Sequence, residues 1–305
     1  MEIKELNYLI AISEEKSISK ASERLFMAQS SLSQFLSTME ANIGTKLFVR
    51  TSKGVRPTEA GERMIRYARM TLAEYHRVQD EIQDINGLKS GSVIIGISTF
   101  RGSYLLPPVL NAFHMEYPGI HVKIVEKNSM ALEQMLLSGE IDLALLVLPV
   151  SQPRIETKFV MKDEICLITN SSHPVMNLAK KNPGDAISRI PQYVNLRDTL
   201  KYEYLLSDYD TILGREARRI FSKNGLVPIA YNETLSALLA AAMAAAGRGL
   251  AFTYYSSRHY FRNAEFLSFG AEGASLDLGI ALPPGRYHSR ATLALEEILM
   301  KVLAE

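Results

Sequence analysis

The sequence predicts a mainly helical N-terminal region followed by a larger α/β region made of two lobes. Apolar residues recur at helical spacing up to Asn86, whereas short strand-like and helix-like runs alternate after Ser92. A short polar stretch at residues 86–92 separates the two patterns. The chain has 305 residues. Since one domain usually takes about 100–200 residues, this length fits more than one domain.

The composition is that of a globular protein, with 47% hydrophobic and 22% charged residues. No apolar run reaches the roughly 20 residues that cross a bilayer. The first residues, MEIKELNYLI, lack the order of a secretory signal. A single cysteine, Cys166, excludes an internal disulfide and a multi-cysteine zinc site. We therefore expect a cytoplasmic protein without a membrane partner.

Two short helices are expected first. The first is amphipathic, with apolar residues at Ile3, Leu6, Leu9 and Ile10. The second is capped by Ser17 or Ser19 and runs to Phe26. Its side chains expected to turn inward are Ala21, Leu25 and Phe26. A tight connection over residues 26–29 then leads to a third helix.

The third helix is expected to separate large apolar residues from small polar ones. Its core face consists of Leu32, Phe35, Leu36, Met39 and Ile43, and Gly44 ends it. Short hydroxyl groups on the opposite face let a helix lie close to the floor of a DNA groove, and glutamine can bond an adenine edge. The helix N-terminus also favours a phosphate oxygen. Two helices joined by a short turn in this way form the helix-turn-helix arrangement. Taken alone, a serine-rich helix is more often an ordinary surface helix.

Residues 47–57 predict a small hairpin, because two apolar runs flank a turn that contains Gly54. Its tip and flanks carry Arg50, Lys53 and Arg56, and bases outnumber acids in this part of the chain. A basic hairpin beside a recognition helix forms a wing, which contacts the DNA backbone or minor groove. The alternative is a charged loop kept for solubility. The position directly after the third helix favours the wing.

Thr58 is expected to cap a long helix that ends at Gly87. Read in sevens, one continuous stripe follows this helix: Gly61, Met64, Ala68, Thr71, Tyr75, Val78, Ile82 and Ile85. Such a stripe needs a partner, and a second copy of the same helix is the simplest one. We therefore expect a homodimer, or a homotetramer, that presents two recognition helices to a two-fold DNA site.

From Leu6 to Gly87 the chain resembles the N-terminal region of LysR-type transcriptional regulators. The resemblance rests on the run ASERLFMAQSSLSQFLSTMEANIGTKLFVRTSKGVRPTEAG, in which ASERL, QSSLS, IG, LFVR and PTEAG keep the family's spacing. It implies that residues 1–58 form a winged helix-turn-helix domain for double-stranded DNA, 59–87 a linker and dimerisation helix, and 88–305 an effector-binding domain. It implies that Gln29, Ser30, Ser33 and Gln34 face the major groove and that Arg50 and Lys53 lie near the DNA backbone. We add Ser31 on the same helix and Arg56 on the same hairpin as expected DNA contacts. Family members often carry Ser at Ala28, Pro at Ser30 and a basic residue at Gln34, so the operator sequence stays open.

The alternating runs after the polar stretch predict two lobes with a parallel sheet covered by helices. Strands are expected at 92–97, 121–126, 141–148, 204–206, 228–231, 250–252 and 276–282, with further strand-like runs within 155–168. Helices are expected at 105–116, entered at Pro107 and Pro108, and at 130–137, 213–224, 235–246 and 290–303. The first lobe then takes about 91–163 and 268–305, and the second about 164–267.

Ligands of such domains sit where strand C-termini meet helix N-termini. The residues at these corners are Ser98, Thr99, Phe100, Arg101, Asn128, Ser129, Leu148, Asp208 and Thr211. Hydroxyl groups and free backbone N–H groups suit a small polar or anionic effector. Arg101 is either the partner of an anionic effector or an exposed loop arginine. The resemblance implies the same place, since the family's effector domain looks like a periplasmic binding protein with its inducer between the lobes.

No pattern in the sequence predicts catalysis, a metal site or a cofactor. Residues 247–249, Gly-Arg-Gly, fit a helix end better than a phosphate loop, and Cys166 lies within an apolar run. The six histidines show no paired metal spacing. We therefore expect a DNA-binding regulator and no enzyme. The alternative is a solute-binding protein for transport, which shares the two-lobed architecture, but the missing secretory signal and the basic wing count against it.

Overall fold

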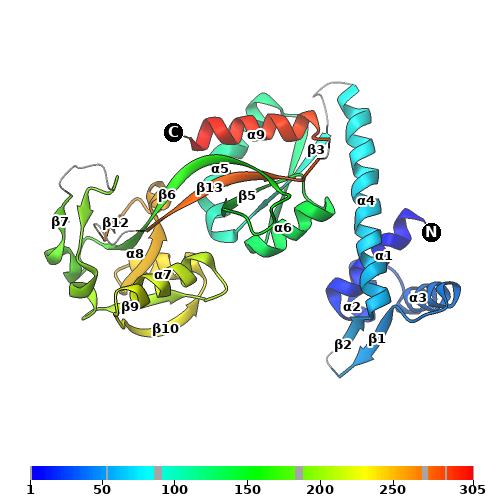
Figure 1. Cartoon of the computed structure of the whole chain (residues 1–305), viewed down its shortest axis with the longest axis horizontal. Helices are drawn as coiled ribbons and strands as arrows, with labels where there is room; N and C mark the ends of the chain where they lie inside the picture. The colour runs from blue at the N-terminus through cyan, green and yellow to red at the C-terminus, as the bar shows by residue number, and fades with distance from the viewer. Residues whose placement is uncertain are drawn as a thin grey trace.

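The computed structural model describes residues 2–52, 54–85, 91–182, 188–269, 274–285 and 287–304. The chain forms a helical N-terminal unit, the long helix α4 (Glu59–Ile85) and a C-terminal domain built on one large sheet. Figure 1 shows α4 standing between the N-terminal unit and the C-terminal domain.

Three helices and a hairpin form the N-terminal unit, as predicted. They are α1 (Ile3–Glu15), α2 (Ile18–Arg24), α3 (Gln29–Ile43), β1 (Phe48–Thr51) and β2 (Gly54–Pro57). Ser17 caps α2 by accepting a hydrogen bond from the N–H of Lys20, and Gly44 ends α3 with a φ of 76°. Their shared core includes Leu6, Leu9, Ile12, Leu32, Leu36, Leu47 and Val55.

Two apolar residues predicted for this core lie at the surface. Phe26 is 98% exposed, because α2 ends at Arg24 and the backbone of Phe26 turns outward with a φ of 53°. Ile43, in the last turn of α3, is 42% exposed, because the chain turns away at Gly44. The helical period therefore carried the predicted core beyond the end of α2 at Phe26 and into the exposed last turn of α3 at Ile43.

α4 begins where the sequence predicts. The hydroxyl of Thr58 accepts a hydrogen bond from the N–H of Gly61 at 3.0 Å and donates one to the carbonyl oxygen of Lys46 at 2.7 Å. The same side chain thus caps the helix and ties it to the start of the hairpin. A Cβ at Gly61 would lie 1.9 Å from the carbonyl oxygen of Leu47, so this contact requires glycine.

The described part of the C-terminal domain contains one sheet of nine strands, in the order β10-β9-β11-β6-β13-β5-β3-β4 with β12 also paired to β6. These strands are β3 (Gly91–Ile97), β4 (Ile120–Glu126), β5 (Leu143–Leu148), β6 (Glu156–Asn170), β9 (Glu203–Ser207), β10 (Ile229–Leu235), β11 (Leu250–Tyr254), β12 (Ala264–Leu267) and β13 (Ala274–Leu282). A separate pair joins β7 (Lys180–Lys181) to β8 (Gln192–Tyr193).

The sheet is mixed, whereas the sequence predicts a parallel one. β3 is parallel to β4 and β5, and β9 is parallel to β10 and β11. β6 and β13 are antiparallel to each other and to the strands beside them. The reason is topological, because these two long strands carry the chain from one lobe to the other and back, as Figure 1 shows.

The ribbon of β6 and β13 contains one irregularity. Leu278 pairs with Met161, but the next residue, Gly279, pairs with Phe159. Val160 is therefore an extra residue on β6, and such a β-bulge bends and twists a strand pair locally. The ribbon is otherwise in register from Glu156–Leu282 to Ile165–Ala274.

Each half of the sheet carries its own helices. Helices α5 (Thr99–Glu116), α6 (Ser129–Ser138) and α9 (Arg290–Leu303) accompany β3, β4 and β5, and α7 (Ile212–Lys223) and α8 (Ala237–Ala245) accompany β9, β10 and β11. Three short 3₁₀ helices complete the described elements: η1 (Pro174–Leu178), η2 (Leu196–Thr199) and η3 (Tyr255–His259). The last helix, α9, has the bounds that the sequence predicts.

α5 begins at Thr99, whereas the sequence predicts a helix entered at Pro107 and Pro108. Both prolines lie inside the helix. Proline has no N–H, so the carbonyl groups of Ser103 and Tyr104 lack their usual helical donor. The extra N-terminal turn contains Phe100, which is buried in the hydrophobic core of the other half of the domain. A long-range contact, invisible to local pattern, extends this helix.

Candidate functional site

The face of α3 that the sequence predicts to meet DNA is open to solvent. Gln29, Ser30, Ser31 and Gln34 are exposed and Ser33 is half-buried. The capping position, Ala28, offers no side-chain acceptor to the first turn of α3. The N–H groups of that turn are therefore available to an external acceptor such as a phosphate oxygen.

The hairpin places its two described arginines on different faces. Arg50 pairs across the hairpin with the buried Val55, and Arg56 pairs with the exposed Val49. Because directly paired residues point to the same side, the two guanidinium groups project from opposite sides of the hairpin. Both are exposed, and neither forms an ion pair with any described residue. Lys53, the third predicted wing contact, lies outside the described residues.

A buried carboxylate holds the hairpin against α3. Glu40 accepts hydrogen bonds from the N–H groups of Leu47 and Phe48, at 2.8 and 3.1 Å, and from the Lys46 ammonium at 2.6 Å. Burial alone would raise the pKa of Glu40, but these donors outweigh it and lower the pKa. Sequence patterns did not identify Glu40, because it lies in an otherwise regular α3 with no motif around it.

The predicted heptad stripe on α4 divides into a covered and an open part. Gly61 and Ala68 are buried in the N-terminal unit. Tyr75, Val78 and Ile82 are 42%, 42% and 56% exposed, and the side chain of Ile85 lies outside the description. The later part of the stripe is therefore an apolar surface on a helix that its own chain leaves open.

α4 is also tied to both neighbouring parts of the chain. Arg69 donates two hydrogen bonds to the carboxylate of Glu140, at 2.8 and 2.9 Å, and one to Glu14 of α1 at 3.3 Å. Near its other end, the Asp84 carboxylate accepts a hydrogen bond from the N–H of Arg290, at the start of α9, at 2.8 Å. The helix is thus fastened to the C-terminal domain at two levels.

The residues predicted for the effector fall into two groups, one in each half of the domain. In the first half, Thr99 donates to Glu126 at 3.2 Å and Asn128 caps α6 by accepting from the N–H of Ala131 at 2.9 Å. The remaining members of this edge are Ser98 at the start of α5, Ser129 at the start of α6 and Leu148 at the end of β5.

In the second half, Thr211 caps α7 by accepting from the N–H of Gly214 at 2.9 Å, and it donates to the carbonyl oxygen of Asp208 at 2.7 Å. Within the described residues, no hydrogen bond or ion pair joins this group to the residues of the first half.

Phe100 and Arg101 form the junction between the halves. Arg101 is 3% exposed, so the expectation of an exposed loop arginine is wrong. Its guanidinium lies 3.8 Å from the ring centroid of Tyr254 and 3.4 Å from Oδ2 of Asp163. Its Nε is buried without a hydrogen-bond partner. Phe100 stacks on the same Tyr254 at 5.9 Å.

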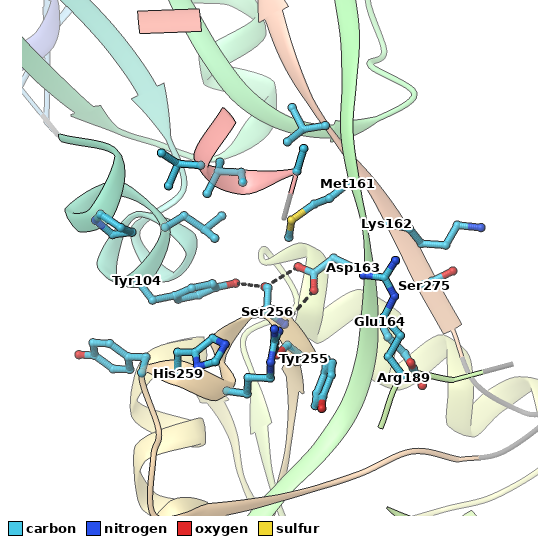
Figure 2. A pocket seen from close by; sticks show the side chains of 18 of the residues that line it. Tyr104, Met161, Lys162, Asp163, Glu164, Arg189, Tyr255, Ser256, His259 and Ser275 are labelled. Atoms are coloured by element: carbon cyan, nitrogen blue, oxygen red, sulfur yellow. Dashed lines mark hydrogen bonds between the residues drawn. The ribbon is translucent and has the colours of Figure 1, made fainter. Parts of the chain in front are cut away.

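A cavity of about 1440 Å³ lies beside this junction, between α5, β6, η3 and the end of α9. Figure 2 shows Tyr104, Ser256 and Asp163 linked in a chain at its wall. Ser256 donates its hydroxyl hydrogen to Asp163 at 2.9 Å, so Tyr104 donates to Ser256 at 3.0 Å. Burial raises the pKa of Tyr104, which keeps that hydroxyl protonated. None of the nine predicted effector residues lines this cavity.

Four cationic side chains surround the cavity: Lys162, Arg189, Arg258 and Arg262. Within the described chain, none of them has a carboxylate at ion-pair distance. Arg258 lies over the ring of Tyr255 at 4.9 Å, and Glu164 accepts a hydrogen bond from Ser188. Apolar and aromatic walls with unpaired cations suit an anionic ligand that has an apolar body. These residues are spread over the sequence, and no local spacing signals them.

Cys166 is fully buried, and burial raises the pKa of its thiol well above the ordinary value. Its sulfur lies 3.8 Å from the carbonyl oxygen of Thr253. In the described parts of the chain, no cluster of three or more His, Cys, Asp or Glu side chains is placed to hold a metal ion. Over the same residues, no helix combines the length and hydrophobicity needed to span a membrane.

Two family models match the chain. The LysR substrate binding domain matches residues 86–304, and the bacterial regulatory helix-turn-helix protein model of the lysR family matches residues 3–62. Together they cover both of the regions in which the sites above lie.

Individual relatives agree with these matches. The chain is 35% identical over 167 residues to an uncharacterized HTH-type transcriptional regulator, YcgK of Bacillus subtilis, across 55% of this chain and 52% of that protein. It is 26% identical over 308 residues to the nitrogen assimilation regulatory protein nac of Escherichia coli, across 100% of this chain and 96% of nac. The fold is similar to that of full-length CbnR complexed with its target DNA, with a TM-score of 0.68, 19% identity and coverage of 99% and 100%.

Proposed function

The chain belongs to the LysR family of transcriptional regulators, and we propose that it binds a two-fold DNA operator as a homodimer or as a homotetramer. The observation that carries this proposal is the open polar face of α3, beside two arginines without ion-pair partners. In helix-turn-helix proteins the N-terminal residues of the second helix contact base edges. Here these residues are Gln29, Ser30, Ser31, Ser33 and Gln34. The side chains of the hairpin that contact the DNA backbone are Arg50, Lys53 and Arg56.

We divide the chain accordingly into three functional parts. Residues 1–58 bind DNA, 59–87 link and dimerise, and 88–305 bind an effector, with lobes of about 91–163 plus 268–305 and 164–267. The open part of the α4 stripe supports the dimer, because three apolar side chains on one helix are buried when two copies pair. A regulator of transcription works at the chromosome, so we place the protein in the cytoplasm. The proposal assigns no catalytic activity.

The DNA-binding face is tested by comparing how two substitutions change the affinity for two duplexes. The probe is the tightest duplex that the wild-type protein selects from a random pool, and an unselected duplex of equal length is the reference. Gln29→Ala is expected to cost about 1–3 kcal/mol on the selected duplex and little on the reference, because a base-edge contact carries sequence information. Arg56→Ala is expected to weaken both alike and to reduce the slope of affinity against salt by about 1. Equal losses on both duplexes for Gln29→Ala contradict the assignment of α3.

We propose further that the C-terminal domain binds a small polar or anionic effector at the strand edges formed by Ser98, Thr99, Phe100, Arg101, Asn128, Ser129, Leu148, Asp208 and Thr211. Hydroxyl groups and helix N-termini at these edges support this place. A second candidate place is the large cavity, which its four unpaired cations favour. Binding regulates the protein only if it differs between two arrangements of the assembly.

A thermal-shift screen of small carboxylates and phosphates tests both places. A ligand at a hundred times its Kd stabilises the fold by about 2.7 kcal/mol. Thr99→Val removes a hydroxyl group at the strand edge, with Thr99→Ser as its control, and Arg258→Ala removes a cation from the cavity. A shift lost only in Thr99→Val identifies the strand edge, and a shift lost only in Arg258→Ala identifies the cavity. A shift that survives in both variants contradicts both places.

The other architecture-sharing function, a solute-binding protein for transport, is not favoured. The helix-turn-helix model matches residues 3–62, a region that solute capture does not use.

A further inference from the structure

Phe26 is the most exposed large apolar side chain among the described residues. It is 98% exposed, in the turn between α2 and α3. A phenylalanine that contacts almost nothing in its own chain gains nothing from folding, because its ring stays in water.

The backbone at Phe26 adds a cost to this exposure. Its φ is 53°, in the left-handed region that side chains with a Cβ rarely adopt. The N–H of Phe26 donates to the carbonyl of Glu23, and the N–H of Met27 donates to the carbonyl of Ser22. This is the bonding that closes a helix in a Schellman motif, where glycine ordinarily occupies the left-handed position. Glycine at residue 26 would therefore suit the fold better than phenylalanine does.

The position of Phe26 points to a use outside the chain. It stands two residues before Ala28, the N-cap of α3, so it adjoins the open face of Gln29 and Ser30. If α3 contacts base edges with its first turn, the turn before it also lies against the duplex. Phenylalanine can contact the methyl group of thymine in the major groove, and the deoxyribose carbons offer a similar apolar surface.

We infer that Phe26 is a DNA-contacting residue whose ring packs on an apolar surface of the operator, either a thymine methyl group or a deoxyribose. This inference rests on the proposed function of α3. Isolation of the ring favours DNA over a protein partner. Leu25 and Met27 beside it are half-buried, and the residues that flank this turn, Glu23, Arg24, Gln29 and Ser30, are exposed and polar. A stable protein interface needs a continuous patch of about 800 Å² on each partner.

The inference predicts opposite effects on stability and on binding. In Phe26→Gly the backbone keeps its left-handed conformation without strain, so the thermal midpoint is expected to equal or exceed that of the wild type. The affinity for the selected duplex is expected to fall about tenfold, since the buried ring is lost. Phe26→Asn tolerates the same backbone and gives a second ring-free variant. Phe26→Tyr keeps the ring and is expected to bind like the wild type.

Met115→Ala is the matched control. Met115, near the end of α5, is also a highly exposed apolar residue, at 86%, but it lies in the C-terminal domain. Its replacement is expected to leave the affinity unchanged.

A second duplex locates the contact. Deoxyuridine replaces thymine throughout the selected duplex, which removes the methyl groups and leaves base pairing intact. If the wild type loses affinity on this duplex and Phe26→Gly does not, the ring packs on a methyl group. If Phe26→Gly loses the same affinity relative to the wild type on both duplexes, the ring of Phe26 packs on a deoxyribose.

Two results overturn the inference. One is an unchanged affinity of Phe26→Gly and Phe26→Asn for the selected duplex. The other is a lowered thermal midpoint in both variants, which assigns the ring a structural role. Failure of the proposed function is distinguishable, because the wild-type protein then selects no duplex at all.

Discussion

Each part of the molecule contains a buried carboxylate beside a candidate functional surface, and the two carboxylates are held by different kinds of neighbours. Glu40, under the hairpin, accepts from backbone N–H groups 7 and 8 positions away along the chain. Asp163, beside the cavity, accepts from Ser256, 93 positions away, and from Arg101, 62 positions away. The hairpin is therefore held to α3 by groups that are close to it along the chain, and the C-terminal junction by contacts between distant segments.

The difference extends to what each part leaves in solvent. The N-terminal unit exposes the side chains proposed to contact DNA, and a regular helix fixes their direction. The C-terminal domain buries its central charges, Arg101 and Asp163, at 3% and 2% exposure. Helical period alone reveals an exposed face, whereas a buried ion pair becomes visible only when the fold brings its partners together.

The largest expected effect comes from breaking the long-range pair. Asp163→Ala leaves the Arg101 guanidinium buried without its counter-ion, and losing one partner of a buried ion pair costs about 3–5 kcal/mol. The free energy of unfolding is measured by urea denaturation, followed by circular dichroism. The double substitution Arg101→Met with Asp163→Leu removes both charges and is expected to recover most of the loss.

The contrast between the two carboxylates is contradicted if Asp163→Ala has the same free energy of unfolding as the wild type. That result means that stacking on Tyr254, together with water that enters the site, is enough to stabilise the charge of Arg101. The junction then does not depend on the carboxylate of Asp163.

A smaller effect is expected at Glu40, because its partners are neighbouring backbone groups that water can reach when the hairpin loosens. Glu40→Gln is expected to cost about 1–3 kcal/mol at neutral pH. The pKa of Glu40 is lowered in the folded chain, so the ionised group stabilises the fold above its ordinary pKa of 4.5. This contribution is lost as the pH falls below that value through the lowered pKa.

Thermal midpoints of the wild type and Glu40→Gln between neutral and acidic pH measure this effect. The gap between the two proteins is expected to narrow as the pH falls, since the wild-type carboxylate becomes protonated. A gap that stays constant with pH shows that the charge of Glu40 does not support the hairpin.

The same distinction explains which parts of the structure the sequence could predict. The end of α3, the bounds of α9 and the start of α4 follow from caps and apolar period, which are local properties. Phe26 was misplaced because the period says nothing of where a helix stops. The start of α5 was misplaced because Phe100 and Arg101 are held by Tyr254 and Asp163, far along the chain.

Candidate sites follow the same rule. The polar face of α3 could be predicted because its residues lie on consecutive turns of one helix. The large cavity could not, since its walls come from α5, β6, η3 and α9, and its cations lie between residues 162 and 262. Glu40 and the chain of Tyr104, Ser256 and Asp163 likewise have no local signature.

The paired strands β6 and β13 limit how the two lobes can move. No loop connects the lobes along these strands, so the lobes cannot swing apart as bodies joined by slack chain do. Any change in their angle must be a flexing of the paired strands, and Val160 on β6, opposite the step between Leu278 and Gly279, is where the hydrogen-bonded ladder is already interrupted. We therefore expect the two lobes to move as rigid bodies whose relative angle changes by bending of the strand pair at Val160.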